Sequence, residues 1–121
     1  MERALDLDAA AASVQRRASQ WAARSLTVGP LTWADGQTTV NELTTRREAV
    51  RGDYSVGIRI RRGDEEGELV VYAGGWCDLD YWAGRADSEP LSEAPGADEP
   101  LDLAELEVVL DRFEGLFQQS G

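Results

Sequence analysis

The sequence contains no histidine, no lysine and one cysteine, Cys77. Without a histidine or a second cysteine, the chain has no usual zinc or haem ligand set, no histidine general base and no internal disulfide. The absence of lysine also excludes the lysine of a phosphate-binding loop. We therefore expect no metal and no cofactor, and the enzyme classes that depend on these residues are excluded.

Long apolar segments are absent as well. No stretch reaches the roughly 18 apolar residues that a membrane span needs. The first residues, Met1–Asp8, include acids where a signal peptide needs an uninterrupted apolar run. We expect a cytoplasmic protein that does not enter a membrane.

Positive charge is scarce. The 121 residues include 23 Asp and Glu against 12 Arg, which gives a net charge of -11. Binding to nucleic acid requires clustered cations, so no nucleic-acid partner is expected. Residues 1–73 carry 11 acids and 10 Arg, whereas residues 74–121 carry 12 acids and 2 Arg. The second part would attract a basic protein, and self-repulsion predicts a monomer when the protein is free.

An N-terminal helix is predicted near residues 8–26. Asp6 or Asp8 can cap its first turn, and Gly29-Pro30 prevents the helix from continuing. Its apolar positions recur at spacings of three and four, with Trp21 as the anchor. This stripe consists of Val14, Ala18, Trp21, Ala22 and Ser25.

A second helix is predicted near residues 102–119. Asp102 and Glu105 form the pattern of a capping box, and Leu101 can pack on Leu106. The apolar stripe that follows is broad and is typical of a helix that covers a core. It consists of Leu103, Leu106, Val109, Leu110, Phe113, Leu116 and Phe117.

Between the helices, the sequence predicts three consecutive antiparallel strands. Apolar and polar residues alternate over residues 54–61, and a polar turn at residues 62–67 leads into residues 68–73. Gly74-Gly75 then predicts a tight hairpin into residues 76–82.

The register of this hairpin decides which side chains share a face. A two-residue turn at Gly74-Gly75 places Ala73 opposite Trp76. The core face then contains Val70, Tyr72, Cys77, Leu79 and Tyr81, with Ile58 and Ile60 added through a bulge at Gly63 or Gly67. The opposite face contains Leu69, Val71, Trp76, Asp78, Asp80 and Trp82.

This opposite face has two interpretations. Trp76 and Trp82 can be covered by the segment from Gly84 to Pro100, with the acids at the solvated edge. Alternatively, the face binds a protein, because tryptophan is enriched among the residues that dominate interface energies and paired aspartates can meet a partner's cations. In that case the centre of the binding surface consists of Trp76, Asp78, Asp80 and Trp82, and its rim consists of Asp87 and Glu89.

Asp78 and Asp80 also allow a catalytic interpretation. Asp78 and Asp80 would lie about 6–7 Å apart on one strand face, within the range in which two carboxylates can divide acid and base roles. Acids two positions apart on a surface strand are common, and a metal site needs further oxygen ligands. No glycine-rich phosphate loop leads from a strand into a helix. We expect a protein that is not an enzyme.

The expected fold is α+β. Helices near residues 8–26 and 102–119 cover one face of a mainly antiparallel sheet of about four strands, within a single domain of residues 1–121. A weaker strand is predicted within Gln37–Thr45, and residues 83–100 are predicted to form an exposed acidic loop.

The hairpin also carries a resemblance to a known family. The stretch Val70-Val71-Tyr72-Ala73-Gly74-Gly75-Trp76-Cys77-Asp78-Leu79-Asp80, an acidic loop and the helix around Leu106–Phe113 resemble the TriTu family of bacterial polymorphic-toxin immunity proteins. Proteins of that group have an aromatic residue, a small or glycine pair, and Cys-Asp-hydrophobic on a hairpin before a closing helix. The likeness covers about residues 52–117. The segment from Pro30 to Arg51 has no counterpart, so a related small immunity family is an alternative.

The resemblance implies a cytoplasmic immunity protein that binds and blocks one cognate toxin domain, without chemistry of its own and without identifying the contact residues. The acidic surface predicts a basic toxin as the partner. The alternative is an acidic secretion or folding chaperone, which would be a dimer with an exposed apolar groove, or another non-catalytic protein-binding module.

Overall fold

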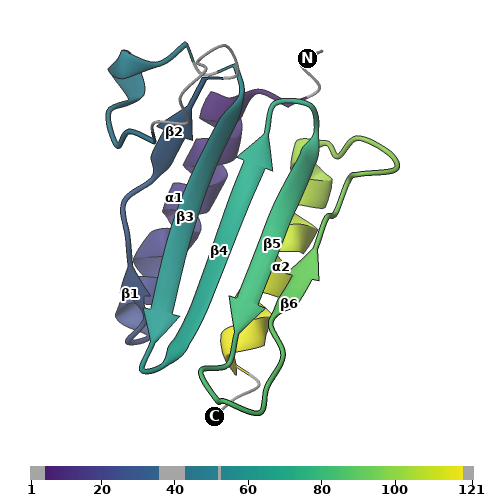
Figure 1. Ribbon diagram of the computed structural model, residues 1–121. Coiled ribbons are helices and arrows are strands. Elements are labelled where there is room, and N and C mark those ends of the chain that lie inside the picture. The colour runs from purple at the N-terminus through teal and green to yellow at the C-terminus, as the bar shows by residue number, and fades with distance from the viewer. Residues whose placement is uncertain (1–4, 36–42, 52, 119–121) are drawn as a thin grey trace.

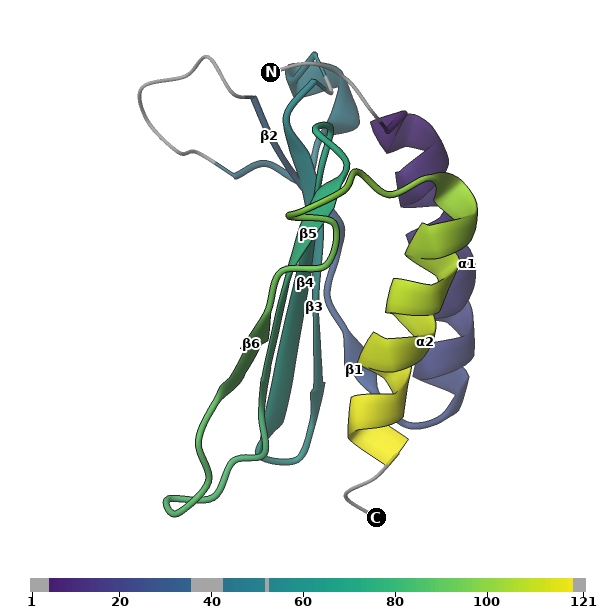
Figure 2. The same cartoon turned by 90° about the vertical axis from the view of Figure 1, so that its right-hand side faces the viewer.

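The chain folds into two layers, with two helices packed on one face of an antiparallel sheet (Figures 1 and 2). The computed structural model describes residues 5–35, 43–51 and 53–118. The predicted α+β fold is confirmed. In chain order the elements are α1 (Leu7–Ala23), β1 (Thr27–Val28), β2 (Thr32–Ala34), η1 (Arg47–Ala49), β3 (Ser55–Arg62), β4 (Glu65–Tyr72), β5 (Trp76–Trp82), β6 (Leu91–Glu93) and α2 (Leu103–Gln118).

The described sheet has six strands, more than the four or so predicted from the sequence. The strand order is β1-β3-β4-β5-β6, and β2 also pairs with β3. β1 and β2 follow one another along the same edge of β3. The predicted strand within Gln37–Thr45 falls mostly outside the described residues, and Thr44 forms an isolated bridge with Trp33.

Both helices begin at the caps that the sequence predicts. Asp6 accepts hydrogen bonds from the backbone N–H groups of Asp8 and Ala9 at 2.9 and 3.3 Å. At the start of α2, the Asp102 side chain accepts from the N–H of Glu105 at 2.8 Å, and the Glu105 side chain accepts from the N–H of Asp102 at 3.1 Å. The capping box is therefore complete at the N-terminus of α2.

Three positions of the predicted helix stripes lie outside the core. Ala22, in the last turn of α1, is exposed, and Ser25 is exposed because α1 ends at Ala23 and the chain turns through a positive φ at Ser25. Leu103 is 40% exposed at the first position of α2, before the helix reaches the sheet-facing cluster. The remaining positions of both stripes are buried as predicted.

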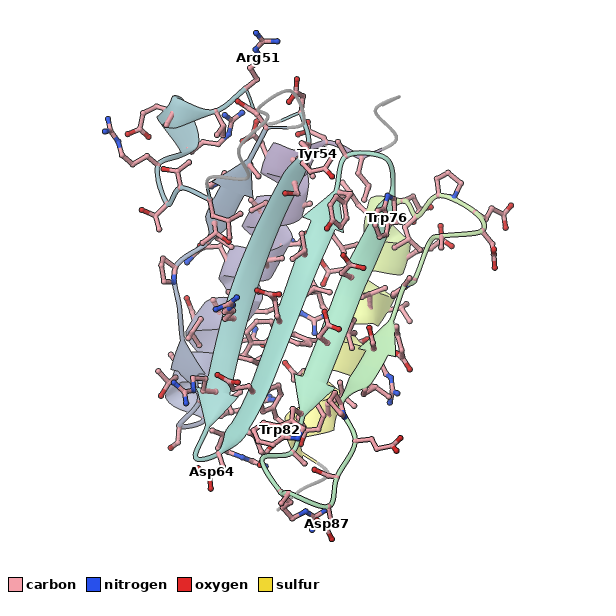
Figure 3. The ribbon with its side chains drawn as sticks, in the orientation of Figure 1. Arg51, Tyr54, Asp64, Trp76, Trp82 and Asp87 are labelled. Carbon is pink, nitrogen blue, oxygen red and sulfur yellow. The ribbon has the colours of Figure 1, made fainter. Side chains whose placement is uncertain are left out.

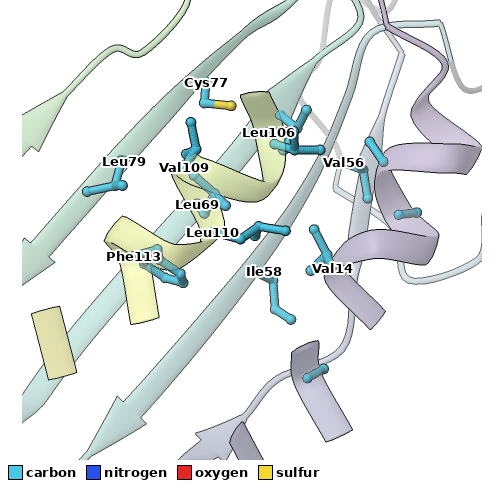
Figure 4. Close-up of a cluster of buried hydrophobic side chains, with 14 of the residues drawn as sticks. Val14, Val56, Ile58, Leu69, Cys77, Leu79, Leu106, Val109, Leu110 and Phe113 are labelled. Carbon is cyan, nitrogen blue, oxygen red and sulfur yellow. The ribbon is translucent and has the colours of Figure 1, made fainter. Parts of the chain in front are cut away.

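The core lies between the sheet and the helices (Figure 4). Trp21, the predicted anchor of α1, is fully buried in this core and also contacts α2. Its ring meets Phe113 edge-on at 5.8 Å, and its indole N–H donates to Glu114 at 2.6 Å. Arg17 adds ion pairs to Glu107 and Asp111 of α2 at 2.8 and 2.9 Å. Polar as well as apolar contacts therefore join the two helices.

The β4–β5 hairpin has a different register from the predicted one. Tyr72, and not Ala73, lies opposite Trp76, so the loop consists of Ala73, Gly74 and Gly75. Gly75 has a φ of 91°, as a three-residue hairpin loop commonly requires at its last position.

Ala73 is held in this loop by tertiary contacts. Its side chain is buried, its N–H donates to the carbonyl of Tyr54 at 2.8 Å, and its carbonyl accepts from Leu5 at 3.0 Å. The one-residue change reverses the two faces of β4. Leu69 and Val71 lie in the core, while Val70 and Tyr72 face outward, so the predicted faces of these residues are wrong.

The β3–β4 hairpin needs no bulge. Arg62 lies opposite Glu65, which leaves a two-residue turn of Gly63 and Asp64 in place of the longer polar turn predicted. Gly63 has the positive φ of 60° that such turns favour at their first position. Ile58 and Ile60 reach the core directly in this register.

The segment predicted as a loop, residues 83–100, is tied to β5. It contains β6, whose residues pair with Leu79–Tyr81 along the edge of β5. The N–H of Cys77 donates to the carbonyl of Pro95 at 2.9 Å. Leu91 packs against the core. The segment therefore extends the sheet.

Candidate functional site

One face of the sheet is covered by the helices, and no described element lies over the other (Figure 2). We call the outward side chains of β3, β4 and β5 the open face. Antiparallel partners lie directly opposite one another, so these residues form rows across the strands. The rows are Ser55–Tyr72–Trp76, Gly57–Val70–Asp78, Arg59–Glu68–Asp80 and Arg61–Glu66–Trp82.

The four predicted central residues all lie on the open face, because they alternate along β5 with the core residues. Trp76 and Trp82 stand at opposite ends of β5 (Figure 3). The predicted rim residues Asp87 and Glu89 are exposed in the connection between β5 and β6, beyond Trp82.

The segment 83–100 does not cover Trp82 in the way the first interpretation requires. Its strand β6 pairs beside β5, and Trp82 remains 38% exposed. Trp76 is half-buried, with one side of its ring against Tyr72. An exposed tryptophan and two nearby carboxylates thus remain available to a partner.

An aromatic cluster that the sequence did not predict lies at one end of the open face. Tyr72 stacks on Trp76 with ring centroids 4.1 Å apart, and Tyr54 meets Tyr72 edge-on at 5.4 Å. The Tyr72 hydroxyl donates to Asp78 at 2.9 Å. Burial and this hydrogen bond raise the pKa of Tyr72 above its ordinary value. The predicted register had placed Tyr72 in the core, so only a correct loop length could have revealed the cluster.

The carboxylates of the open face differ from strand to strand. On β4, Glu68 and Glu66 pair with Arg59 and Arg61 of β3 at 2.6 and 3.5 Å. On β5, Asp78 accepts from Tyr72, and Asp80 accepts from the Ser92 hydroxyl at 2.8 Å.

The partners of the two β5 aspartates are therefore neutral hydroxyl groups. Within the described residues, neither Asp78 nor Asp80 forms an ion pair. Uncompensated negative charge consequently lies along β5, where a partner's cation would find two carboxylates.

A pocket of about 480 Å³ lies at the Trp82 end of the open face. Arg59 and Arg61 line one side, and Trp82 and Pro90 line the other. Glu66 and Glu68 of β4 lie between the two sides, and Asp80 lies on the same strand as Trp82. The sequence could not reveal this pocket, because its walls come from three strands and the connection to a fourth.

The cysteine of the chain is not placed to act as a nucleophile. Cys77 is fully buried, and burial together with nearby Asp78 raises the pKa of its thiol to about 12, so the reactive thiolate does not form near neutral pH. No group of three or more Asp, Glu, Cys or His side chains within the described ranges is arranged to hold a metal ion. None of the described helices is long and apolar enough to cross a membrane.

Comparison with protein families, curated proteins and solved structures finds no match for this chain. The features that bear on its function are the open face and the sequence pattern of the β4–β5 hairpin.

Proposed function

We propose that the protein is a cytoplasmic bacterial immunity protein that binds a cognate toxin domain and neutralises it, without catalysis of its own. The observation that carries this proposal is the open face, on which tryptophans stand at both ends of β5. This strand carries two aspartates, neither of which forms an ion pair with another described residue. The resemblance of the hairpin to TriTu immunity proteins supports the choice of a toxin as partner.

The open face supplies both components of a tight interface. Trp76 and Trp82 provide apolar area at the two ends of β5, and tryptophan is enriched among the residues that contribute most to interface energies. Asp78 and Asp80 provide charge-assisted hydrogen bonds to arginine or lysine side chains of a basic toxin. Asp87 and Glu89, at the rim, add long-range attraction that accelerates encounter.

The proposal predicts that a gene beside the one for this chain encodes a secreted toxin domain, and the test is to express that domain with and without the present chain. We expect the toxin alone to stop growth, co-expression to restore it, and the purified pair to form a one-to-one complex. A neighbouring toxin that stays active and unbound would overturn the proposal. A dimer that delivers an intact effector to a secretion system would instead favour the chaperone alternative.

The double substitution Asp78→Asn with Asp80→Asn tests the assigned face. Asparagine keeps an oxygen that can accept from Tyr72 and Ser92, so we expect the free energy of unfolding to change by less than about 1 kcal/mol. Binding to the toxin should weaken by about 2–5 kcal/mol, because desolvated charge pairs are lost. Calorimetry of both proteins against the toxin measures this difference.

The matched control is Asp98→Asn with Glu99→Gln, which removes two exposed charges from the connection between β6 and α2. This control should slow association with the toxin slightly, and the slowing should disappear at high salt. Wild-type affinity in the folded Asp78/Asp80 double variant would show that another surface binds the toxin.

A further inference from the structure

The pocket beside Trp82 has two walls of different chemistry. One wall is cationic, because it consists of Arg59 and Arg61 of β3. The other is formed by the ring of Trp82 and by Pro90, and Trp82 is 38% exposed. A side chain that enters this pocket thus meets an aromatic surface on one side and positive charge on the other.

The acids of the pocket are not equally available. Arg59 holds Glu68 at 2.6 Å, and Arg61 holds Glu66 at 3.5 Å. Asp80 alone among these three has a hydroxyl, from Ser92, as its described partner. Because Arg59 and Arg61 neutralise Glu68 and Glu66, an incoming cation is attracted to the β5 side, toward Asp80 and Trp82.

The Asp80 carboxylate can accept two further hydrogen bonds from a group that enters the pocket. The Ser92 hydroxyl uses Oδ1 of Asp80 at 2.8 Å, so Oδ2 and the second lone pair of Oδ1 remain as acceptors. A guanidinium presents two parallel N–H donors to such a carboxylate and is flat enough to stack on an indole ring. A lysine ammonium makes neither arrangement as well.

We infer that this pocket receives one arginine side chain from the surface of the protein partner, with its guanidinium stacked on Trp82 and hydrogen-bonded to Asp80. The inference rests on the proposed function, since it specifies which group of the toxin surface the open face recognises. Recognition is then selective for arginine over lysine at this position and not only for positive charge.

The test uses the free chain labelled with ¹⁵N and titrated with N-acetyl-arginine amide or N-acetyl-lysine amide. The indole N–H of Trp82 and the backbone N–H of Asp80 are followed by NMR. We expect saturable shifts at millimolar arginine derivative and a dissociation constant several-fold higher for the lysine derivative. Equal, non-saturating shifts for both compounds at every acidic residue would overturn the inference.

Variants separate the pocket from general acidity. Asp80→Asn should raise the dissociation constant for the arginine derivative about tenfold, as loss of a charge-assisted bidentate contact does. Trp82→Leu should raise it by a smaller factor through loss of stacking. Asp98→Asn, which removes the same charge from an exposed position off the open face, should change it less than twofold. Equal effects of Asp80→Asn and Asp98→Asn would contradict the inference.

The two proposals fail separately. A chain that neutralises the toxin but does not distinguish arginine from lysine at Trp82 retains the proposed function and loses the pocket inference. A chain that binds the arginine derivative at Trp82 but leaves the toxin active retains the pocket and loses the immunity function.

Discussion

Gly67 shows how one missing side chain shapes the core. It lies on β4 beneath α2, and a Cβ atom at this position would come within 2.7 Å of the Phe117 ring and 2.9 Å of the Phe113 ring. Both distances are far shorter than van der Waals contact. Glycine therefore lets the two phenylalanines rest directly on the strand.

We expect Gly67→Ala to destabilise the fold by about 1–3 kcal/mol, as overpacking of a filled core does. Gly115→Ala in α2 is the matched control, because its Cβ would meet no atom within 4 Å. It should stabilise the protein by about 0.5–1 kcal/mol through helix propensity. Urea unfolding measures the free energy of unfolding of both variants. Equal values for the two variants would show that the phenylalanine rings shift at no cost.

The Cys77 thiol should act as a reporter of global unfolding. It is fully buried, and its pKa is raised to about 12, chiefly by burial. We expect no reaction with a disulfide reagent at pH 8 in the native protein and complete reaction in urea. Rapid labelling of the native protein would mean that β5 opens locally.

The same raised pKa predicts a loss of stability in alkali. An unfolded cysteine ionises near pH 8.5, whereas the folded thiol keeps its proton until about pH 12. The unfolded state therefore binds fewer protons across this interval, and the free energy of unfolding falls as pH rises from about 9 to 12. In the Cys77→Ala variant, the free energy of unfolding should fall less steeply with pH. Urea unfolding at a series of pH values between about 9 and 12 measures this difference.

Among the elements, α2 and β5 could be predicted from the sequence because their signals are local. The box at Asp102 and Glu105, the apolar stripe of α2 and the alternation along β5 need no knowledge of neighbours. The four central residues of the candidate site were placed on one face for that reason.

The register of β4 could not be predicted because tertiary contacts decide it. Gly74-Gly75 fits a two-residue loop as well as a three-residue one. The backbone bonds of Ala73 to Tyr54 and Leu5, from distant parts of the chain, select the longer loop. The Tyr72–Trp76 stack and the pocket beside Trp82 depend on that selection, so both were beyond reach of the sequence.

The capping box offers a prediction at the scale of one helix. Asp102→Ala removes the acceptor for the Glu105 N–H at 2.8 Å and should lower the free energy of unfolding by about 1 kcal/mol. Asp98→Ala, at an exposed position four residues earlier, should leave it within about 0.5 kcal/mol. Urea midpoints that are equal for the two variants would show that α2 is held by its apolar face alone.

At the scale of the whole molecule, the arginines serve mainly the fold. Arg17 joins the two helices, Arg47 pairs with Asp8 at 2.7 Å, and Arg112 pairs with Glu93 at 3.0 Å. Each of these cations is matched by the chain's own carboxylate. The net charge of -11 therefore stands on the surface as excess acid.

This excess predicts a monomer in the absence of a partner, because like-charged copies repel one another. Light scattering at micromolar concentration should give the mass of one 13.2 kDa chain. The result should hold at low salt, where repulsion is strongest. A tight dimer under these conditions would contradict the prediction and favour the chaperone alternative.

The position of β6 also determines how copies of this protein meet in a crowded solution. β6 ends the strand order, has three residues and lies between Pro90 and Pro95. Prolines have no N–H, so a strand from another chain would find few donors along this margin, and the exposed Glu89 would repel a second copy. Edge-to-edge pairing into fibrils is thereby discouraged at β6. The proposed recognition therefore uses the face of the sheet, where side chains rather than backbone groups would contact the partner.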